Sequence, residues 1–337
     1  MINILRKKMS NKQKVSDFLN KNLKNKKFNY FDVGARNGSF LLPEDYAKNT
    51  IVHAFEPNME EFKKLKSKST DAFKKGITEP KFKKKILYNT ALYEKKCQMK
   101  LFITSGPGAV SLMGPADKII SENLWRKFDK GTNYYLKHQK IKKIETVKCN
   151  KIDNLWKKND FIDFLKLDTE GSELKILRGA QTNLRKKKIL MIKTEYLLVP
   201  YYKKHYLLGH QQVFLDKFGY RLIYFDNNHY DYSWKESAVD ETYDKRFQYA
   251  GDAYFIPDPD LNNLDQEQLL RLGIICLAMG FNSSGINFLK KTEFFSKNIF
   301  QELESLASKP SKIRYLVNLW KNTPKNIANF LKLGEVN

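Results

Sequence analysis

Short apolar runs and segments with helical spacing alternate along the first part of the chain. The runs at 28–33, 51–56, 85–92, 161–167 and 189–194 predict buried strands, since each is short and mostly apolar. Apolar residues recur at helical spacing after two of these runs, at Phe62 and Leu65 and again at Leu174, Ile176 and Leu177. This alternation of strand and helix predicts an α/β fold built on a doubly wound, mostly parallel sheet.

Alternation of polar and apolar residues marks a second group of strands. Residues 95–104 are predicted to form a hairpin arm, and residues 141–149 another alternating strand. The runs at 220–225 and 252–256 are predicted to close the sheet as a late antiparallel hairpin. Glycine, proline and serine are concentrated at 105–114, which is therefore predicted to be a loop that shapes a substrate pocket.

The same patterns divide the chain into three parts. Residues 1–27 are lysine-rich with apolar residues at helical spacing, and they predict an amphipathic leading helix. Residues 28–257 contain every predicted strand. Pro257 and Pro259 mark a boundary, and residues 258–337 show only helical spacing, so they are predicted to form a helical C-terminal extension.

Charge and cysteine content restrict the function classes only loosely. The formal net charge of +24 would attract nucleic acid or an anionic membrane. Only nine of the 61 basic residues are arginine, the residue that nucleic-acid readers favour, so codon usage is the preferred explanation of the charge. The three cysteines lie far apart with no metal-binding spacing, which favours a reducing, cytoplasmic setting. No apolar stretch is long enough to span a bilayer.

The first predicted strand ends in a short glycine-containing turn. Asp32 closes the strand, and Gly34, Arg36, Asn37 and Gly38 follow it. Glycines let the backbone approach a ligand closely, and Asp32 can accept a hydrogen bond from an ammonium group. The spacing is not G-x-G-x-x-G, since Arg36 stands where the second glycine would be, and a nicotinamide cofactor is therefore disfavoured.

The next two strands supply further candidate cofactor contacts. Glu56 follows the second strand, where a carboxylate can accept both ribose hydroxyls of an adenosine. The alternative is that Glu56 is a helix cap or a surface acid. Asn89 and Ala91, near the end of the third strand, can border an adenine. Together these three strand ends suit S-adenosylmethionine, with a carboxylate and glycines near its amino-acid part and an acid for its ribose.

The run at 161–167 delivers Asp168 and Glu170 to the end of a strand, and Glu195 ends the following strand. Carboxyl ends of parallel strands meet at the edge where open α/β folds bind ligands, so these three acids are candidate catalytic residues. One of them can act as the general base for a hydroxyl nucleophile. Alternatively, Asp168 and Glu195 hold a magnesium ion together with the substrate oxygen.

Other interpretations of this region stay open. One alternative is that Glu170 and Glu173 have no catalytic role and simply stabilise the start of the following helix. His205 and His210 are alternative bases, although a solvated surface position is the favoured interpretation of His205. The tyrosines at 196, 201 and 202 suit either stacking on a sugar face or packing against a helix.

These motifs, in this order, resemble the FkbM family of S-adenosylmethionine-dependent methyltransferases over roughly residues 28–256. The resemblance rests on Asp32-Val33-Gly34-Ala35 with Gly38, on Ala54-Phe55-Glu56-Pro57, on Lys166-Leu167-Asp168-Thr169-Glu170-Gly171 with Glu173, and on weaker matches at Thr90-Ala91-Leu92 and Val110-Ser111-Leu112. The chain departs from the family at Arg36, where asparagine is usual. The resemblance implies a class I, Rossmann-like fold and methyl transfer, commonly to a hydroxyl of a sugar or other small molecule.

Two other functions compete with this expectation. A nucleic-acid methyltransferase would use the lysine-rich band at 63–85, where Phe62, Phe73 and Phe82 are interleaved for base stacking. The chain lacks the Asn/Asp-Pro-Pro-Tyr/Phe motif and any Pro-Cys dipeptide, so nucleic acid is disfavoured as a partner. A non-catalytic module on the same fold is the third interpretation, and the acids at the strand ends argue against it. The sequence predicts neither the acceptor nor the oligomeric state.

Overall fold

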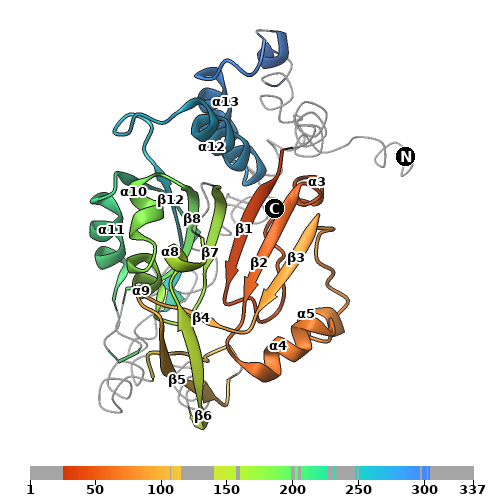
Figure 1. Cartoon of the computed structure of the whole chain (residues 1–337), viewed down its shortest axis with the longest axis vertical. Coiled ribbons are helices and arrows are strands. Elements are labelled where there is room, and N and C mark those ends of the chain that lie inside the picture. Colours follow the sequence, from red (N-terminus) through yellow and green to blue (C-terminus); the bar gives the residue numbers. More distant parts are fainter. Residues whose placement is uncertain are drawn as a thin grey trace, which may run out of the picture.

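A seven-stranded sheet forms the centre of the molecule, with the strand order β3-β2-β1-β7-β8-β12-β9 (Figure 1). The computed structural model describes residues 26–106, 108–114, 140–156, 160–198, 202–203, 206–226, 231–232, 247–248, 250–296, 298–301 and 303. The strands of the sheet are β1 (Phe28–Val33), β2 (Thr50–Phe55), β3 (Lys84–Tyr88), β7 (Ile162–Leu167), β8 (Ile189–Leu197), β9 (Tyr220–Asp226) and β12 (Ala250–Pro257).

Most of this sheet is parallel, as predicted. Strand β1 pairs in parallel with β2 on one side and β7 on the other, and β8 continues the parallel series. Strand β12 is antiparallel to both of its neighbours, β8 and β9. The predicted antiparallel pair of late strands is therefore confirmed, and the structure adds that β12 lies inside the sheet while β9 forms its edge.

Helices cover both faces of the sheet. Alternate residues of a strand point to opposite faces, so one strand can contribute side chains to two hydrophobic clusters. Along β1, Phe28 and Tyr30 join one hydrophobic cluster, whereas Phe31 and Val33 join another. The second cluster contains α8 (Ile152–Leu155), α9 (Glu173–Arg178), α10 (Gln181–Arg185) and α11 (Leu208–Asp216). The first contains residues of α3 (Glu44–Ala47), α4 (Met59–Lys66), α12 (Gln266–Ala278) and α13 (Asn282–Lys290), and the short helix α5 (Asp71–Lys74) follows α4.

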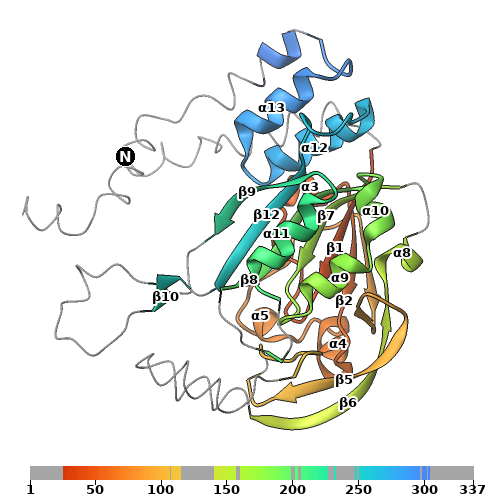
Figure 2. The same ribbon diagram turned by 90° about the vertical axis from the view of Figure 1, so that its left-hand side faces the viewer.

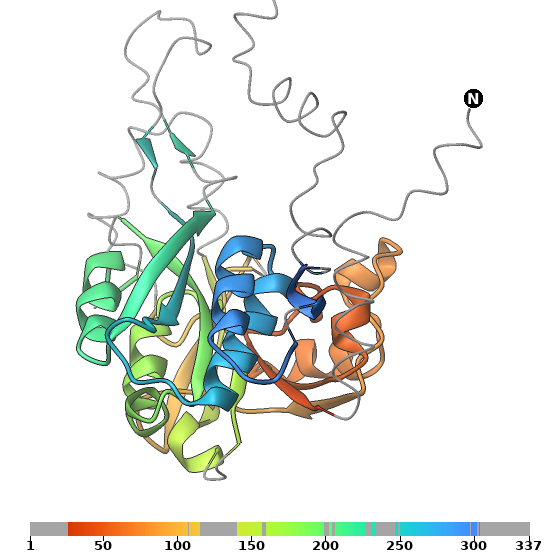
Figure 3. The ribbon, with the colours of Figure 1, turned by 90° about the horizontal axis from the view of Figure 1, so that it is seen from above.

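The described part of the C-terminal extension packs against the sheet. Helix α12 begins with a capping box between Asp265 and Gln268, and it contacts β7, β8 and α13 (Figure 3). The guanidinium of Arg271 on α12 pairs with the carboxylate of Asp163 on β7 at 2.9 Å, and Asp163 is 1 % exposed. The predicted helical character of this segment is confirmed as far as residue 290, and these helices share the hydrophobic core of the sheet.

A smaller three-stranded sheet lies at the opposite end of the molecule from α12 and α13 (Figures 1 and 2). Its strands are β4 (Ala91–Leu92), β5 (Cys97–Thr104) and β6 (Ile141–Asn150), in the order β4-β6-β5. The predicted hairpin arm is β5, paired antiparallel with β6. The single strand predicted at 85–92 is wrong, because the chain turns at Asn89 and divides it into β3 and β4.

Some predictions fall outside the described residues. The leading helix at 1–27 is one of these, since the description begins at residue 26. Between β9 and β12 the structure describes only the short pair β10 (Asp231–Tyr232) and β11 (Phe247–Gln248). Among the helices that are described, none has both the length and the apolar character needed to cross a membrane.

Candidate active site

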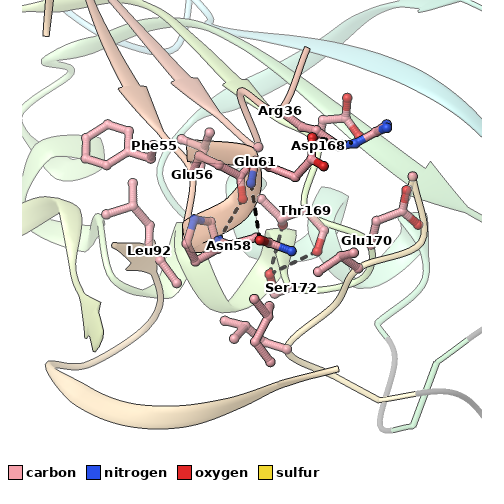
Figure 4. A pocket seen from close by; sticks show the side chains of 18 of the residues that line it. Arg36, Phe55, Glu56, Asn58, Glu61, Leu92, Asp168, Thr169, Glu170 and Ser172 are labelled. Carbon is pink, nitrogen blue, oxygen red and sulfur yellow. Dashed lines mark hydrogen bonds and ion pairs between the residues drawn. The ribbon is translucent and has the colours of Figure 1, made fainter. Parts of the chain in front are cut away.

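A cavity of about 310 Å³ opens at the carboxyl ends of the parallel strands, where the sheet meets the smaller sheet. Its size lies within the ~300–1,000 Å³ typical of small-molecule sites. Figure 4 shows Phe55 and Leu92 toward one side of the view, Glu56 and Asn58 near its middle, and Asp168 and Glu170 toward the other side. The cavity therefore changes from apolar to acidic along its length.

The turn after β1 forms one wall of the cavity. Four residues predicted to contact a cofactor, Gly34, Arg36, Asn37 and Gly38, line it. Gly34 has a φ of +83°, and a Cβ at this position would lie 1.8 Å from the carbonyl oxygen of Asp168. This glycine is therefore required for the close approach of the turn to the end of β7, in addition to any contact with a ligand.

Arg36 reaches across the turn to two helices. Its Nε lies 3.3 Å from a carboxylate oxygen of Glu61 on α4, and one of its terminal nitrogens lies 2.9 Å from Asp71 on α5. The side chain is 21 % exposed and lines the cavity beside Glu61. Arg36 therefore holds this wall together while part of its guanidinium faces the cavity.

Asp32 is fully buried and does not line the cavity. Its carboxylate accepts a hydrogen bond from the Ser39 hydroxyl at 2.6 Å and lies 3.2 Å from the ammonium of Lys166. Lys166 also pairs with Asp168 at 3.1 Å and donates to the carbonyl of Gly34 at 3.1 Å. The cation that Asp32 contacts here is thus a lysine of the chain itself, and it joins β1 to β7.

Lys166 lines the cavity, and sequence reasoning gave it no role. Burial lowers the pKa of Lys166, but Asp168 and Asp32 outweigh this effect and raise it above the ordinary lysine value. Lys166 therefore stays protonated. Its position two residues before Asp168 in a strand was the signal available in the sequence, because residues two apart point to the same face.

Glu56 lines the middle of the cavity and is 5 % exposed. One of its oxygens accepts a hydrogen bond from the backbone N–H of Asn58 at 2.8 Å. Asn58, not Glu56, caps α4, because its side chain accepts from the N–H groups of Glu60 and Glu61. Burial raises the pKa of Glu56 to about 7, and the hydrogen bond from Asn58 opposes that rise. The interpretation of Glu56 as a cap or a surface acid is therefore wrong.

The two residues predicted to border an adenine after the third strand have different surroundings. Ala91 lines the cavity together with Leu92 and Phe55. The amide of Asn89 instead donates to the carbonyl oxygens of Glu56 and Pro57, at 2.9 and 3.1 Å. Asn89 thus fixes the turn that positions Glu56, and its predicted contact with a cofactor stays a prediction.

The three predicted catalytic acids come together at the acidic end. Oxygen atoms of Asp168, Glu170 and Glu195 all lie within 4.8 Å of one another, and all three residues line the cavity. Burial and the charge of Asp168 raise the pKa of Glu170 to about 8. Burial, followed by the charges of Glu170 and Asp168, raises the pKa of Glu195 well above its ordinary value. Mutual repulsion of this kind is relieved by protonation or by a bound cation.

Glu173 supports the turn that carries these acids. One of its oxygens accepts hydrogen bonds from the N–H and the hydroxyl of Thr169, both at 2.8 Å, and from the N–H of Gly171 at 3.3 Å. Glu173 is 2 % exposed and lies in the first turn of α9, which agrees with the structural interpretation of this residue. Glu170 has a φ of +58° and extends its carboxylate to the hydroxyl of Tyr202.

The remaining candidates near Glu195 in the sequence lie in different parts of the structure. Tyr196 is buried and packs edge-on against Phe225, so it belongs to the core. His210 is exposed on α11, beside Tyr206, and does not line the cavity. His205 and Tyr201 lie outside the described residues.

The predicted loop at 105–114 covers part of the cavity, as expected. Gly108, Val110 and Leu112 line it, together with Leu101 of β5. The hydroxyl of Ser111 donates to the carbonyl oxygen of Glu170 at 2.5 Å and ties the loop to the acidic turn. Sequence reasoning did not identify Leu101 or the link through Ser111, since both depend on β5 folding back over the sheet.

Two of the aromatic residues interleaved in the lysine-rich band pack against other rings. Phe73 packs on Phe40 with ring centroids 6.2 Å apart, and Phe82 packs on the buried Tyr30 at 6.4 Å. Lys63 and Lys66 are exposed on α4, as expected for a solvated helix face. The two phenylalanines thus contribute to packing and do not form an exposed stacking platform.

A model of one known protein family matches the part of the chain that forms most of the sheet and the cavity. The model of the methyltransferase FkbM domain matches residues 32–222, which begins at Asp32 and includes Glu56, Asp168 and Glu195. No curated protein and no solved structure matches the chain. The family match covers more than half of the 337 residues. The chain therefore belongs to the FkbM methyltransferase family.

Proposed function

We propose that this protein is an S-adenosylmethionine-dependent O-methyltransferase that acts on a hydroxyl of a sugar, a glycan or another small molecule. The observation that carries the proposal is the order of residues along one cavity: apolar at Phe55 and Leu92, buried carboxylates at Glu56 and Glu61, and an acidic group at Asp168. That order matches the adenine, the ribose and the reacting end of an adenosine sulfonium.

The residues of the cavity suit this cofactor. Phe55, Ala91 and Leu92 would pack against the adenine, and Glu56 would accept hydrogen bonds from the ribose hydroxyls. Arg36 and Asn37, with the backbone of the glycine turn, would bind the amino-acid end. The cofactor supplies an activated methyl group, so the protein has to align the acceptor oxygen and remove its proton.

The three carboxylates at the acidic end are suited to that second task. A neutral hydroxyl is a poor nucleophile, and the raised pKa values of Glu170 and Glu195 make their ionised carboxylates stronger bases than an ordinary glutamate. Alternatively, Asp168 and Glu195, with Glu170 close by, would hold a divalent cation such as magnesium. The separation of their oxygens by no more than 4.8 Å supports this alternative.

The two chemical alternatives differ in their response to chelation. If a cation is required, treatment with a chelator removes methyl transfer, and added magnesium restores it. Calcium is the informative substitute, because it also prefers oxygen ligands but is larger and less strict in its geometry. Activity that is unchanged by a chelator would remove the cation alternative and leave a carboxylate as the base.

The proposed activity itself is tested by transfer of a labelled methyl group to nucleotide sugars, lipid-linked sugars, glycans and RNA. Glu56→Ala is expected to abolish cofactor binding in calorimetry, whereas Asp168→Ala is expected to spare binding and remove turnover. Glu293→Ala, at an exposed acid outside the set that lines the cavity, is the control for a general loss of charge. Transfer to RNA alone, or full turnover by Asp168→Ala, would contradict the proposal.

A further inference from the structure

Two of the three cysteines, which are 52 positions apart in sequence, are direct neighbours in the structure. Cys97 is the first residue of β5 and Cys149 is the next-to-last residue of β6, and the antiparallel register pairs one with the other. Both are free thiols. Cysteine spacing in the sequence gave no indication of this pair, because its proximity depends on the register of the hairpin arm.

We propose that Cys97 and Cys149 are an oxidation site at which an intrachain disulfide forms across β5 and β6. Residues directly opposite each other in an antiparallel pair have Cα atoms about 4.5–5.5 Å apart and side chains on the same face. A disulfide requires Cα atoms about 4.4–6.8 Å apart, so the bond fits without separating the strands. This proposal does not depend on the proposed methyl transfer.

The two thiols differ in accessibility, which sets the order of the reaction. Cys97 is half-buried, whereas Cys149 is 2 % exposed. Burial, with the neighbouring Cys97 thiol close enough to share a hydrogen bond, raises the pKa of Cys149 to about 12. An oxidant therefore reaches Cys97 first, and the exposed Lys95 and Lys96 beside it favour an anionic oxidant.

The oxidant that we name is the disulfide of a small thiol, such as glutathione disulfide. The Cys97 thiolate attacks one sulfur of this disulfide, the S–S bond of the reagent breaks, and one small thiolate leaves. The Cys149 sulfur then loses its proton and attacks Cys97 Sγ, which releases the second small thiolate. The two cysteine thiols are oxidised, the reagent is reduced to two thiols, and the two protons pass to them.

The position of the bond connects it to the cavity. Cys149 pairs on its other side with Ala91 of β4, and Ala91 and Leu92 line the cavity. Leu101, four residues after Cys97 in β5, lines it as well. A disulfide at this point would fix the strands that carry one wall of the cavity relative to each other.

The test uses the full chain, folded and treated with glutathione disulfide. Free thiols are counted after denaturation, and linked peptides are identified by mass spectrometry. The wild-type protein and Cys276→Ser are each expected to lose two thiols and to yield one crosslink between the Cys97 and Cys149 peptides. Cys276 is the matched control, because it is fully buried in α12.

The single variants separate the two steps. Cys149→Ser is expected to stop at a glutathione adduct on Cys97, and Cys97→Ser is expected to form neither adduct nor crosslink. A wild-type protein that stops at the adduct, or that links Cys97 or Cys149 to Cys276 or to a second chain, would overturn the proposal. As a second readout, oxidation is expected to raise the midpoint of thermal unfolding of wild type and Cys276→Ser, and of neither single variant. An equal rise in Cys97→Ser would also overturn it.

Discussion

Gly34 and Asp168 approach so closely that a Cβ on Gly34 would lie 1.8 Å from the carbonyl oxygen of Asp168. The N–H of Asp168 donates to the carbonyl of Val33 at 3.1 Å, so the pairing of β1 with β7 continues to the base of the cavity. The turn that forms one wall of the cavity and the strand end that carries the catalytic candidates are therefore one packed unit.

Gly34→Ala is expected to disrupt this unit. The added methyl group must displace backbone, and the φ of +83° is unfavourable for alanine, so strain and overpacking together are expected to cost about 2–5 kcal/mol in the free energy of unfolding. Gly76→Ala is the matched control, since Gly76 has a φ of +76° and nothing within 4 Å of the added Cβ. Equal losses in the two variants, measured by denaturant unfolding, would show that the contact with Asp168 does not matter.

The positions of the main strands could be predicted because burial on both faces makes them continuous apolar runs. The acids at their ends were predicted to meet, because the carboxyl ends of parallel strands lie at one edge of the sheet. Glu56, Asp168, Glu170 and Glu195 all line the cavity. Asp32 is an exception, because it does not line the cavity. Its position at the end of a strand did not show that a positively charged side chain of the protein itself would pair with its carboxylate. Lys166 occupies that role, as the register of β1 with β7 shows.

Features that depend on long-range packing could not be predicted. The division of 85–92 into β3 and β4 follows from hydrogen bonds of Asn89 to the backbone of another turn. The contact of Ser111 with Glu170 requires β5 to fold over the edge of the sheet. Likewise, the apolar residues of 266–290 predicted helices, but not that α12 would cover the sheet and pair Arg271 with Asp163.

The buried carboxylate of Glu56 is expected to make the binding of S-adenosylmethionine sensitive to pH. Its pKa is raised to about 7, so the carboxylate becomes protonated as the pH falls below that value. If the ribose hydroxyls donate to the ionised form, the Kd for S-adenosylmethionine is expected to weaken by about tenfold one pH unit below this pKa. Calorimetry across this range in two buffers of different ionisation enthalpy would measure both the Kd and the protons released.

The control for this pH dependence is Glu56→Gln. The amide keeps one oxygen as an acceptor and does not titrate, so its Kd is expected to be weaker than that of wild type and constant with pH. A wild-type Kd that stays constant through neutral pH would exclude the ionised carboxylate as the ribose partner. A fall in affinity shared by both variants would assign the titration to another group.

Ser111→Ala is expected to loosen the loop that covers the cavity. The variant loses the hydrogen bond from Ser111 to the Glu170 carbonyl, and the N–H of Met113 loses the acceptor that it has at 3.0 Å. A typical hydrogen bond contributes about 0.5–1.5 kcal/mol, which corresponds to a Kd for the cofactor weaker by up to about tenfold. Ser67→Ala, at the exposed serine that follows α4 as its C-cap, is the control. If both variants bind the cofactor equally well, the loop does not contribute to the closed cavity.

Lys166 is expected to stabilise the fold mainly by neutralising Asp32. Lys166→Met keeps much of the side-chain volume but leaves a fully buried carboxylate whose one remaining hydrogen-bond partner, among the described residues, is the Ser39 hydroxyl. Breaking a buried pair in this way typically costs about 3–5 kcal/mol. Denaturant unfolding measures this loss, and Lys63→Met, at an exposed lysine of α4, should change the stability by less than about 0.5 kcal/mol.

The double variant Asp32→Asn with Lys166→Met distinguishes this explanation from a simple loss of packing. Asparagine keeps an oxygen to accept from Ser39 and carries no charge, so the double variant is expected to recover much of the stability that Lys166→Met loses. The resulting coupling energy between the two positions would be well above the ~0.5 kcal/mol expected for independent sites. Additive losses would mean that Lys166 acts through Asp168 or the Gly34 carbonyl instead, since those are its other contacts at about 3 Å.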